Sequence, residues 1–245
     1  MRRVKAVEVK GLTFRYPGAP EPVLNDLHFA LPEGARCLLL GANGVGKSTL
    51  LRLVAGRHML PAEAIRVLGR PAFHDTSLAA EVGFLGGDFP FRHDITVEEV
   101  LSHRPGVDPA RRGRALEILD VDPRWRMHQL SDGQRRRVQI LLEVERSLRL
   151  LLLDEVTADL DVLARADLLR LLREDSEERR LTVIYASHVL DGLGPFASHL
   201  LFLSPGRVRC FAPTADIPEL AEAAGPGASP LHRLCERWMS EDRRR

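Results

Sequence analysis

The chain has 245 residues, 44% of them hydrophobic and 28% charged, which is enough to bury a core as one large domain with room for an inserted subdomain. A formal net charge of +1 at pH 7 gives no overall attraction to nucleic acid or to an acidic membrane surface. Only three widely spaced cysteines are present, which is typical of a reducing compartment and disfavours a disulfide framework or a zinc site. The first residues lack the apolar core of a signal peptide, and no stretch approaches the roughly 18 consecutive apolar residues of a membrane span. We therefore expect a cytoplasmic protein without direct membrane insertion.

Two strands are expected at the beginning of the chain. Residues 4–16 alternate apolar and polar and end at a Pro-Gly pair, which predicts an edge β-strand followed by a turn. Residues 23–31 predict a second, antiparallel strand. A hairpin would place Tyr16 beside the glycine-rich motif that follows, where its ring could stack on a purine. An ordinary strand aromatic at a sheet edge fits the spacing equally well.

Residues 34–50 run from an apolar strand through a glycine-rich turn into a helix-forming segment. Gly41, Gly46, Lys47 and Ser48 fit G-x-x-x-x-G-K-[ST] without a mismatch. In such a turn backbone N–H groups converge on phosphate oxygens at a helix N-terminus, the lysine adds positive charge, and the hydroxyl is an oxygen ligand suited to Mg²⁺. The strand before and the helix after argue against a chance turn. The nucleotide-binding loop is predicted to comprise Gly41, Ala42, Asn43, Gly44, Val45, Gly46, Lys47, Ser48 and Thr49.

Short apolar runs at 65–68 and 82–85 predict strands, and the glycine-rich, acidic stretch that follows predicts a loop. Beyond it, Thr96 and Asp108 are natural helix N-caps, the second followed by proline at the first helical position. Residues 96 to about 146 are therefore expected to form a helical subdomain inserted into an α/β core.

Ser131 is expected to cap a further helix inside that subdomain. This helix opens on Gly133, so its N-terminal N–H groups could bind a second anion. Together with the glycine-rich loop, this helix start would give the chain two half-sites. The alternative is simple capping, with the arginines at 135–137 forming a solvated basic face.

Two buried strands are expected to end in polar side chains. Residues 149–154 supply four leucines followed by Asp154 and Glu155, as in a parallel strand that delivers carboxylates at its carboxyl end. Asp154 would hold Mg²⁺, directly or through water, and Glu155 would orient and deprotonate the attacking water. Residues 181–186 predict another strand, followed by His188, which could reach a γ-phosphate. A surface acidic pair and a structural histidine are the alternatives.

The order of these motifs resembles the nucleotide-binding domain of the ABC ATPases over residues 5–212. The resemblance implies an α/β P-loop core with an antiparallel β subdomain and an inserted helical subdomain. It also implies a Mg²⁺-dependent ATPase that binds ATP as a head-to-tail homodimer, in which the signature motif of one subunit closes over the nucleotide of the other. The family roles then fall on Tyr16 (adenine stacking), Ser131, Asp132, Gly133 and Gln134 (signature), Asp154 and Glu155 (Walker B), Asp161 (D-loop) and His188 (switch histidine).

Three positions depart from the family pattern. Gly87, followed by Asp88, stands where most members have the Q-loop glutamine, which usually touches Mg²⁺ and lines the region that contacts membrane subunits. Asp88 could replace that oxygen ligand, although a solvated loop acid is the alternative. Asp132 replaces a signature glycine, and Val156 replaces the proline after the Walker B glutamate. The missing glutamine weakens the case for coupling to a transporter.

Residues 119–134, 151–165 and 185–193 resemble more closely a small group of soluble, free-standing ABC proteins. The fungal member of that group is associated with the carbon-catabolite-repression and NOT regulatory complex, and its plant members are classed as non-intrinsic. This resemblance implies an ATP-driven switch in a regulatory complex. The alternatives are the energy-coupling subunit of a membrane transporter and a nucleotide sensor that dimerises without turnover.

Residues 1–212 are thus expected to form the ATP-binding domain, and 213–245 a linker and a short C-terminal helix. Within 231–239, Leu234 and Trp238 share one helix face. We expect this helix to dock on the core of its own chain, the alternative being a partner-binding helix.

Overall fold

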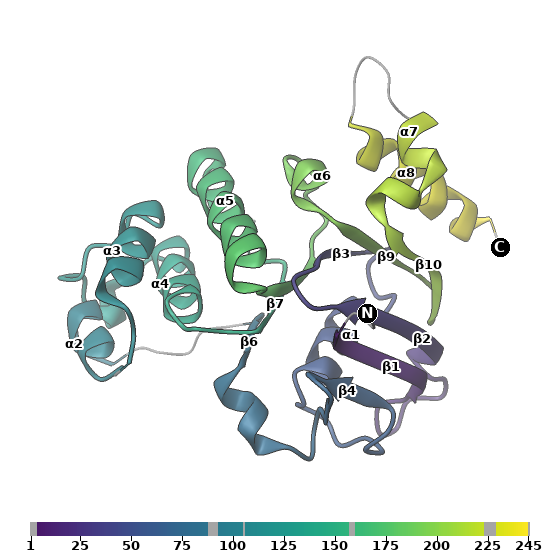
Figure 1. The fold of residues 1–245 in the computed structure, drawn as a ribbon, viewed down its shortest axis with the longest axis horizontal. Helices are drawn as coiled ribbons and strands as arrows, with labels where there is room; N and C mark the ends of the chain where they lie inside the picture. The colour runs from purple at the N-terminus through teal and green to yellow at the C-terminus, as the bar shows by residue number, and fades with distance from the viewer. Residues whose placement is uncertain (1–3, 88–92, 105, 157–159, 223–228, 245) are drawn as a thin grey trace.

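The computed structural model describes residues 4–87, 93–104, 106–156, 160–222 and 229–244. They form two neighbouring β-sheets with helices packed around the larger one (Figure 1). The smaller sheet is antiparallel, in the order β2-β1-β4-β5, and the larger has the order β10-β9-β3-β8-β7-β6. The smaller sheet comprises β1 (Lys5–Phe14), β2 (Leu24–Pro32), β4 (Ile65–Val67) and β5 (Arg70–Pro71). The larger comprises β3 (Arg36–Leu40), β6 (Val82–Leu85), β7 (Leu150–Asp154), β8 (Thr182–Ala186), β9 (His199–Ser204) and β10 (Arg207–Pro213).

The larger sheet is parallel except for β10, and its middle strands are buried on both faces. In β3, Leu39 belongs to the core shared with α1 (Lys47–Val54) and the smaller sheet. Leu38 and Leu40 belong instead to the core on the opposite face, which includes α5 (Val162–Arg179). Burial on both faces explains why these strands appear in the sequence as unbroken apolar runs. The carboxyl ends of the parallel strands meet at one edge, where the predicted polar residues follow them.

The prediction that the first strand is an edge strand is wrong. β1 pairs with β2 on one side, as predicted, and with β4 on the other. β4 has only three residues and β5 only two. The apolar pattern of strands this short does not indicate which strand they pair with. Pairing of β1 on its second side could therefore not be predicted from the sequence.

The helices of 96–146 lie beside β6, at the end of the sheet away from β10 (Figure 1). Thr96 caps the first of them through a capping box, and Asp108 caps the next, with proline at its first turn. The insertion of a helical subdomain is thereby confirmed. Its elements are α2 (Val97–Ser102), α3 (Pro109–Ile118), the 3₁₀ turn η2 (Met127–Gln129) and α4 (Asp132–Val144).

The C-terminal helix α8 (Pro230–Arg243) packs on the larger sheet of its own chain, as expected. The ring of Trp238 lies edge-on to that of Phe202 in β9, with centroids 5.0 Å apart, and the guanidinium of Arg209 lies over the indole. The remaining short elements are η1 (Thr76–Ala80), α6 (Leu193–Phe196), η3 (Thr214–Asp216) and α7 (Pro218–Glu222). The domain boundary at residue 212 stays a prediction.

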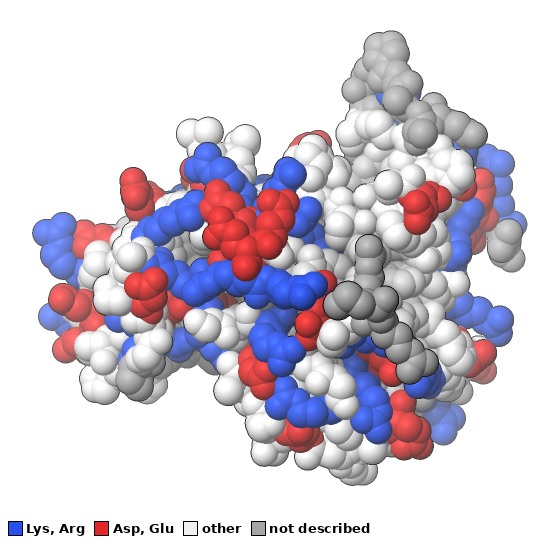
Figure 2. All heavy atoms as spheres, viewed as in Figure 1, with Lys and Arg blue, Asp and Glu red and all other residues white. Residues whose placement is uncertain are grey.

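Acidic and basic side chains are interspersed on the face shown in Figure 2, in keeping with the small net charge. Within the parts of the chain that the structure describes, no helix has the length and apolar character needed to cross a membrane. The cytoplasmic location stays a prediction.

Candidate active site

A cleft of about 480 Å³ opens at the carboxyl edge of the larger sheet. It brings together the glycine-rich loop after β3, the loop after β6, the end of β7 and one residue of α4. Sequence-predicted residues that are more than 40 positions apart in the chain therefore share one cavity. The described residues that line it are Asn43, Gly44, Gly46, Lys47, Ser48, Thr49, Gly87, Arg136, Asp154 and Glu155.

Glycine is required at two positions of the loop. Gly41 and Gly46 have φ angles of 144° and 104°. A Cβ atom on Gly41 would lie 2.4 Å from the carbonyl oxygen of Leu203, and one on Gly46 would lie 2.6 Å from the Leu24 side chain. The loop is thus packed tightly against both sheets, and its backbone leads directly into the N-terminus of α1. A helix N-terminus of this kind attracts phosphate.

Lys47 lies at the base of the loop, with 7% of its surface exposed. Its ammonium group donates hydrogen bonds to the carbonyl oxygens of Gly41 and Ala42, both at 2.9 Å. Burial lowers the pKa of Lys47, and the nearby carboxylates of Glu155 and Asp154 oppose that shift. A positive charge is therefore held against the loop backbone, within the same cleft as the two carboxylates.

The hydroxyl of Ser48 donates a hydrogen bond of 3.0 Å to Oδ1 of Asp154. Burial raises the pKa of Asp154, the hydrogen bond from Ser48 opposes the rise, and the charge of Glu155 adds to it. Two hard oxygen ligands from separate motifs therefore meet inside the cleft. The roles of Ser48 and Asp154 as Mg²⁺ ligands stay a prediction.

Glu155 adopts a left-handed backbone conformation, with φ of 55°, although it is not glycine. Its N–H donates to the carbonyl oxygen of Ala186 at the end of β8, which holds the turn. Oε1 of Glu155 lies 3.4 Å from Nδ1 of His188, and their side chains are 41% and 57% exposed. Backbone strain of this kind persists where surrounding structure enforces it and is frequent at functional sites. The structure thus places the predicted switch histidine next to the predicted base, and of the two only Glu155 is among the described residues that line the cleft.

Tyr16 lies next to the loop but is absent from the described lining of the cleft. Its hydroxyl is 3.2 Å from Oγ1 of Thr49, and its ring makes edge-on contacts with Phe14 and His58. The hairpin therefore does fold Tyr16 back to the start of α1. Adenine stacking by this ring stays a prediction.

The structure describes all four signature residues, Ser131 to Gln134, and none of them lines the cleft of its own chain. Ser131 caps α4 in a capping box with Gln134. Asp132 is fully exposed, and the N-terminus of α4, including Gly133, lies outside the described lining of the cleft; its role as a second half-site stays a prediction. Asp161 caps α5 by accepting a hydrogen bond from the N–H of Ala164, and it forms a 2.9 Å ion pair with Arg137 of α4.

The departures from the family pattern have different outcomes. Gly87 lines the cleft, and Val156 is fully buried. Asp88 lies outside the described residues, so its proposed role as a replacement ligand stays a prediction. Arg136 was not predicted as a site residue. The sequence suggested only that it belongs to a solvated basic face. No pattern in the sequence indicates this position, because the contact that holds Arg136 at the cleft is with Gly87, 49 residues away.

Comparison with known proteins identifies the family. Residues 24–158 match the family model described as ABC transporter, which is more than half of the chain. The chain belongs to this family. As an ABC protein it carries an ATP-binding domain of the kind that generally hydrolyses ATP.

Two relatives extend this result to most of the chain. ABC transporter I family member 20 of Arabidopsis thaliana is 40% identical over 99% of this chain and 78% of its own length. CCR4-associated factor 16 of Saccharomyces cerevisiae is 40% identical over 83% of this chain and 77% of its own length. The likeness to plant and fungal proteins that the sequence motifs indicated is thereby confirmed.

A solved structure supports the fold. A dimeric ATP-binding cassette bound to ADP and phosphate, in a post-hydrolysis state, aligns with a TM-score of 0.68 at 23% identity. The alignment covers 84% of this chain and 98% of that one. The predicted P-loop α/β fold is confirmed.

Proposed function

We propose that this chain hydrolyses ATP in a head-to-tail dimer and acts as a switch in a regulatory protein complex. The observation that carries the proposal is the convergence of Lys47, Ser48, Asp154 and Glu155 on one cleft. Phosphoryl transfer depends mainly on positioning and charge stabilisation, and this cleft offers both.

Within the cleft, the loop backbone and Lys47 bind the β- and γ-phosphates, and Glu155 accepts a proton from the attacking water. The left-handed turn at Glu155, held by Ala186, points to a base placed in a fixed position. His188, 3.4 Å from Glu155, orients that carboxylate and reaches the γ-phosphate. These roles account for the polar side chains at the ends of β7 and β8.

Ser48 and Asp154 fit the requirements of Mg²⁺. Their oxygens lie 3.0 Å apart in the cleft, and Mg²⁺ prefers a few protein oxygens together with phosphate oxygens and water. When bound, the ion neutralises negative charge on the phosphate oxygens. The proposal therefore assigns these two residues as its protein ligands.

The dimer is inferred from the separation of two half-sites. The capped N-terminus of α4 is an anion-binding end of a 13-residue helix, yet its residues do not line the cleft of their own chain. A second copy in head-to-tail orientation supplies that end to the cleft. The dimeric form of the similar cassette bound to ADP and phosphate supports this arrangement.

The regulatory role is supported by the likeness to CCR4-associated factor 16 and by the glycine at the Q-loop position. A second candidate is the energy-coupling subunit of a transporter. A groove of about 350 Å³ between α1, η1 and α4 favours it, because Phe73 and Phe84 line that groove and Phe73 is 39% exposed. A groove of this kind, in which apolar rings lie beside charged side chains such as Arg57 and Glu143, can seat a partner helix. Co-purification of the native protein with membranes and multi-span proteins would favour the transporter, and co-purification with a multi-subunit regulatory complex the switch.

The test of turnover uses the parent protein and Glu155→Gln. The parent is expected to release phosphate from ATP when Mg²⁺ is added, and Glu155→Gln to lose at least about 100-fold in rate because the amide cannot accept the proton. Size-exclusion chromatography should then show Glu155→Gln trapped as a dimer with ATP. Equal rates for the two proteins would remove Glu155 as the base. A parent that dimerises with ATP but releases no phosphate would identify a nucleotide sensor.

A further inference from the structure

Among the described residues that line the cleft, Arg136 alone comes from the helical subdomain. It lies in α4, five residues after the cap Ser131, so it is carried by the same helix as the signature motif. Its NH1 group donates to the carbonyl oxygen of Gly87 at 3.1 Å and to Oε1 of Gln139 at 2.6 Å. These bonds link the guanidinium to its own helix and to the loop after β6.

The position of Gly87 places this guanidinium at the carboxylate end of the cleft. Leu85 pairs with Leu153 in the parallel register of β6 and β7, so the residues that follow run alongside Asp154 and Glu155. A Cβ atom on Gly86 would lie 2.8 Å from Cβ of Asp154, which shows how closely the two segments approach. The chemistry proposed for ATP takes place at this end, where the γ-phosphate must lie between the glycine-rich loop and Glu155.

Gly87 borders open space. No atom lies within 4 Å of a Cβ built on Gly87, so nothing in the described chain crowds this point of the cleft lining. A guanidinium presents a planar fork of N–H donors that matches two phosphate oxygens, whereas the ammonium of Lys47 acts as a point charge. The cleft therefore combines a lysine from the loop with an arginine from α4.

We propose that Arg136 contacts the γ-phosphate of ATP bound in the cleft of its own chain and thereby distinguishes ATP from ADP. This inference rests on the proposed function of the cleft as an ATP site. Because α4 carries both Arg136 and Ser131, the contact also ties the orientation of the signature helix to the presence of the γ-phosphate. ADP lacks that phosphate and leaves the helix without the contact.

The test compares the binding of ADP and of the non-hydrolysable analogue adenylyl imidodiphosphate to the full-length protein, its Arg136→Ala and Arg136→Lys variants, and a control. Arg124→Ala is the matched control, because Arg124 lies in the same subdomain with its side chain 85% exposed and paired with Asp122. Loss of a charge-assisted phosphate contact predicts a loss of about 10-fold or more in analogue affinity for Arg136→Ala. Arg136→Lys should fall between the parent and Arg136→Ala.

Affinity for ADP is expected to stay within about twofold of the parent in all variants, since ADP carries no γ-phosphate and therefore offers Arg136 no charge-assisted contact. Retained ADP binding also shows that the variant has folded. An equal loss for both nucleotides, or no loss for either, would overturn the role of Arg136. A parent protein that binds neither nucleotide would instead overturn the proposed function itself, so the two failures are distinguishable.

Discussion

The two edges of the larger sheet are built differently. At the carboxyl edge, Lys47 is bonded only to backbone oxygens in the described contacts, and Glu155 holds a strained, half-exposed position beside His188. At the opposite edge, arginines and carboxylates form pairs between neighbouring segments. We propose that polar groups at the first edge bind a ligand, whereas those at the second pair with one another within the protein. The groups proposed to bind a ligand therefore lie at one end of these strands, and the ion pairs that hold neighbouring segments together lie at the other end.

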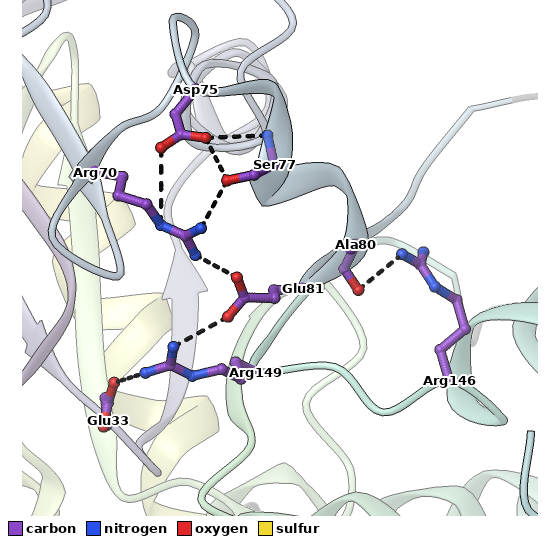
Figure 3. A network of polar contacts seen from close by, with 8 residues as sticks. All are labelled: Glu33, Arg70, Asp75, Ser77, Ala80, Glu81, Arg146 and Arg149. Carbon is purple, nitrogen blue, oxygen red and sulfur yellow. Dashed lines mark hydrogen bonds and ion pairs between the residues drawn. The ribbon is translucent and has the colours of Figure 1, made fainter. Parts of the chain in front are cut away.

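Figure 3 shows part of the opposite edge. Glu81, just before β6, accepts from Arg70 of β5 and from Arg149, and Arg149 also donates to Glu33. Arg146, after α4, donates to the carbonyl oxygens of Ala79 and Ala80 in the η1 turn, the second of which is drawn in Figure 3. These contacts connect the smaller sheet, the larger sheet and the helical subdomain. Three parts of the chain are thereby held at the edge that lies away from the cleft.

Glu145→Ala is expected to have the largest effect. The Glu145 side chain is fully buried at the end of α4 and pairs with Arg104 and Arg112, at 2.6 and 2.7 Å. Removing it leaves two partly buried guanidiniums without their carboxylate, which should lower the free energy of unfolding by about 3 kcal/mol. Urea denaturation measures this loss, and Glu117→Ala, on the exposed face of α3, is the control. A change below about 0.5 kcal/mol, the usual size for a surface substitution, would show that these two ion pairs do not stabilise the subdomain.

Lys47→Ala comes next and acts on the carboxyl edge of the larger sheet. Loss of a positive charge from the phosphate site should weaken ATP binding by about 100-fold. Equilibrium titration with labelled ATP measures the change, with Lys10→Ala as the control because the side chain of Lys10 is 64% exposed on β1. The free energy of unfolding should change little, because the ammonium of Lys47 pairs with backbone oxygens rather than with a buried carboxylate. Unchanged ATP affinity in a folded Lys47→Ala protein would contradict the contrast between the edges.

Glu81→Ala should have the smallest effect, a loss of about 1 kcal/mol in the free energy of unfolding, because the network is partly exposed. The side chain of Arg70, and then that of Arg149, lowers the pKa of Glu81 below its ordinary value of 4.5. A lowered folded-state pKa contributes stability above the unfolded value and loses it as pH falls. The difference between parent and variant should therefore be full at pH 7 and shrink below about pH 4.5. A difference that is independent of pH would mean that the charge of Glu81 is not what stabilises the edge.

The cleft was easier to predict from the sequence than its surroundings. The glycine-rich loop, the leucine run before Asp154 and the cap at Ser131 are contiguous patterns, so their type could be predicted from neighbouring residues. The positions of β1 and Arg136 depend on pairing between distant segments. β1 is covered by β4, and Arg136 reaches Gly87, which is 49 residues away. Hydrophobic periodicity reflects the spacing of nearby residues and does not indicate contacts between distant segments. The long helix α5 was also not predicted, although the apolar residues of its inner face are buried.

The ion pairs of the opposite edge could not be predicted from the sequence for the same reason. Arg149 lies 116 residues from Glu33 and 68 from Glu81, and these residues are ordinary charged positions in the sequence. Only the fold identifies which of the arginines are structural and which face the cleft. The assignment of Arg136 to the cleft and Arg149 to the opposite edge therefore depends on the structure.

The most direct test of the account is complementation between two inactive variants, Lys47→Ala and Ser131→Asp. Aspartate is also a good N-cap, so Ser131→Asp preserves α4 while placing a negative charge at the proposed second half of the site. Each variant alone should release almost no phosphate from ATP. In an equal mixture, half of the dimers contain both variants and each of these has one intact composite site, so about a quarter of the parent rate should return. A mixture that stays as inactive as its components would contradict a site shared between two copies of the chain.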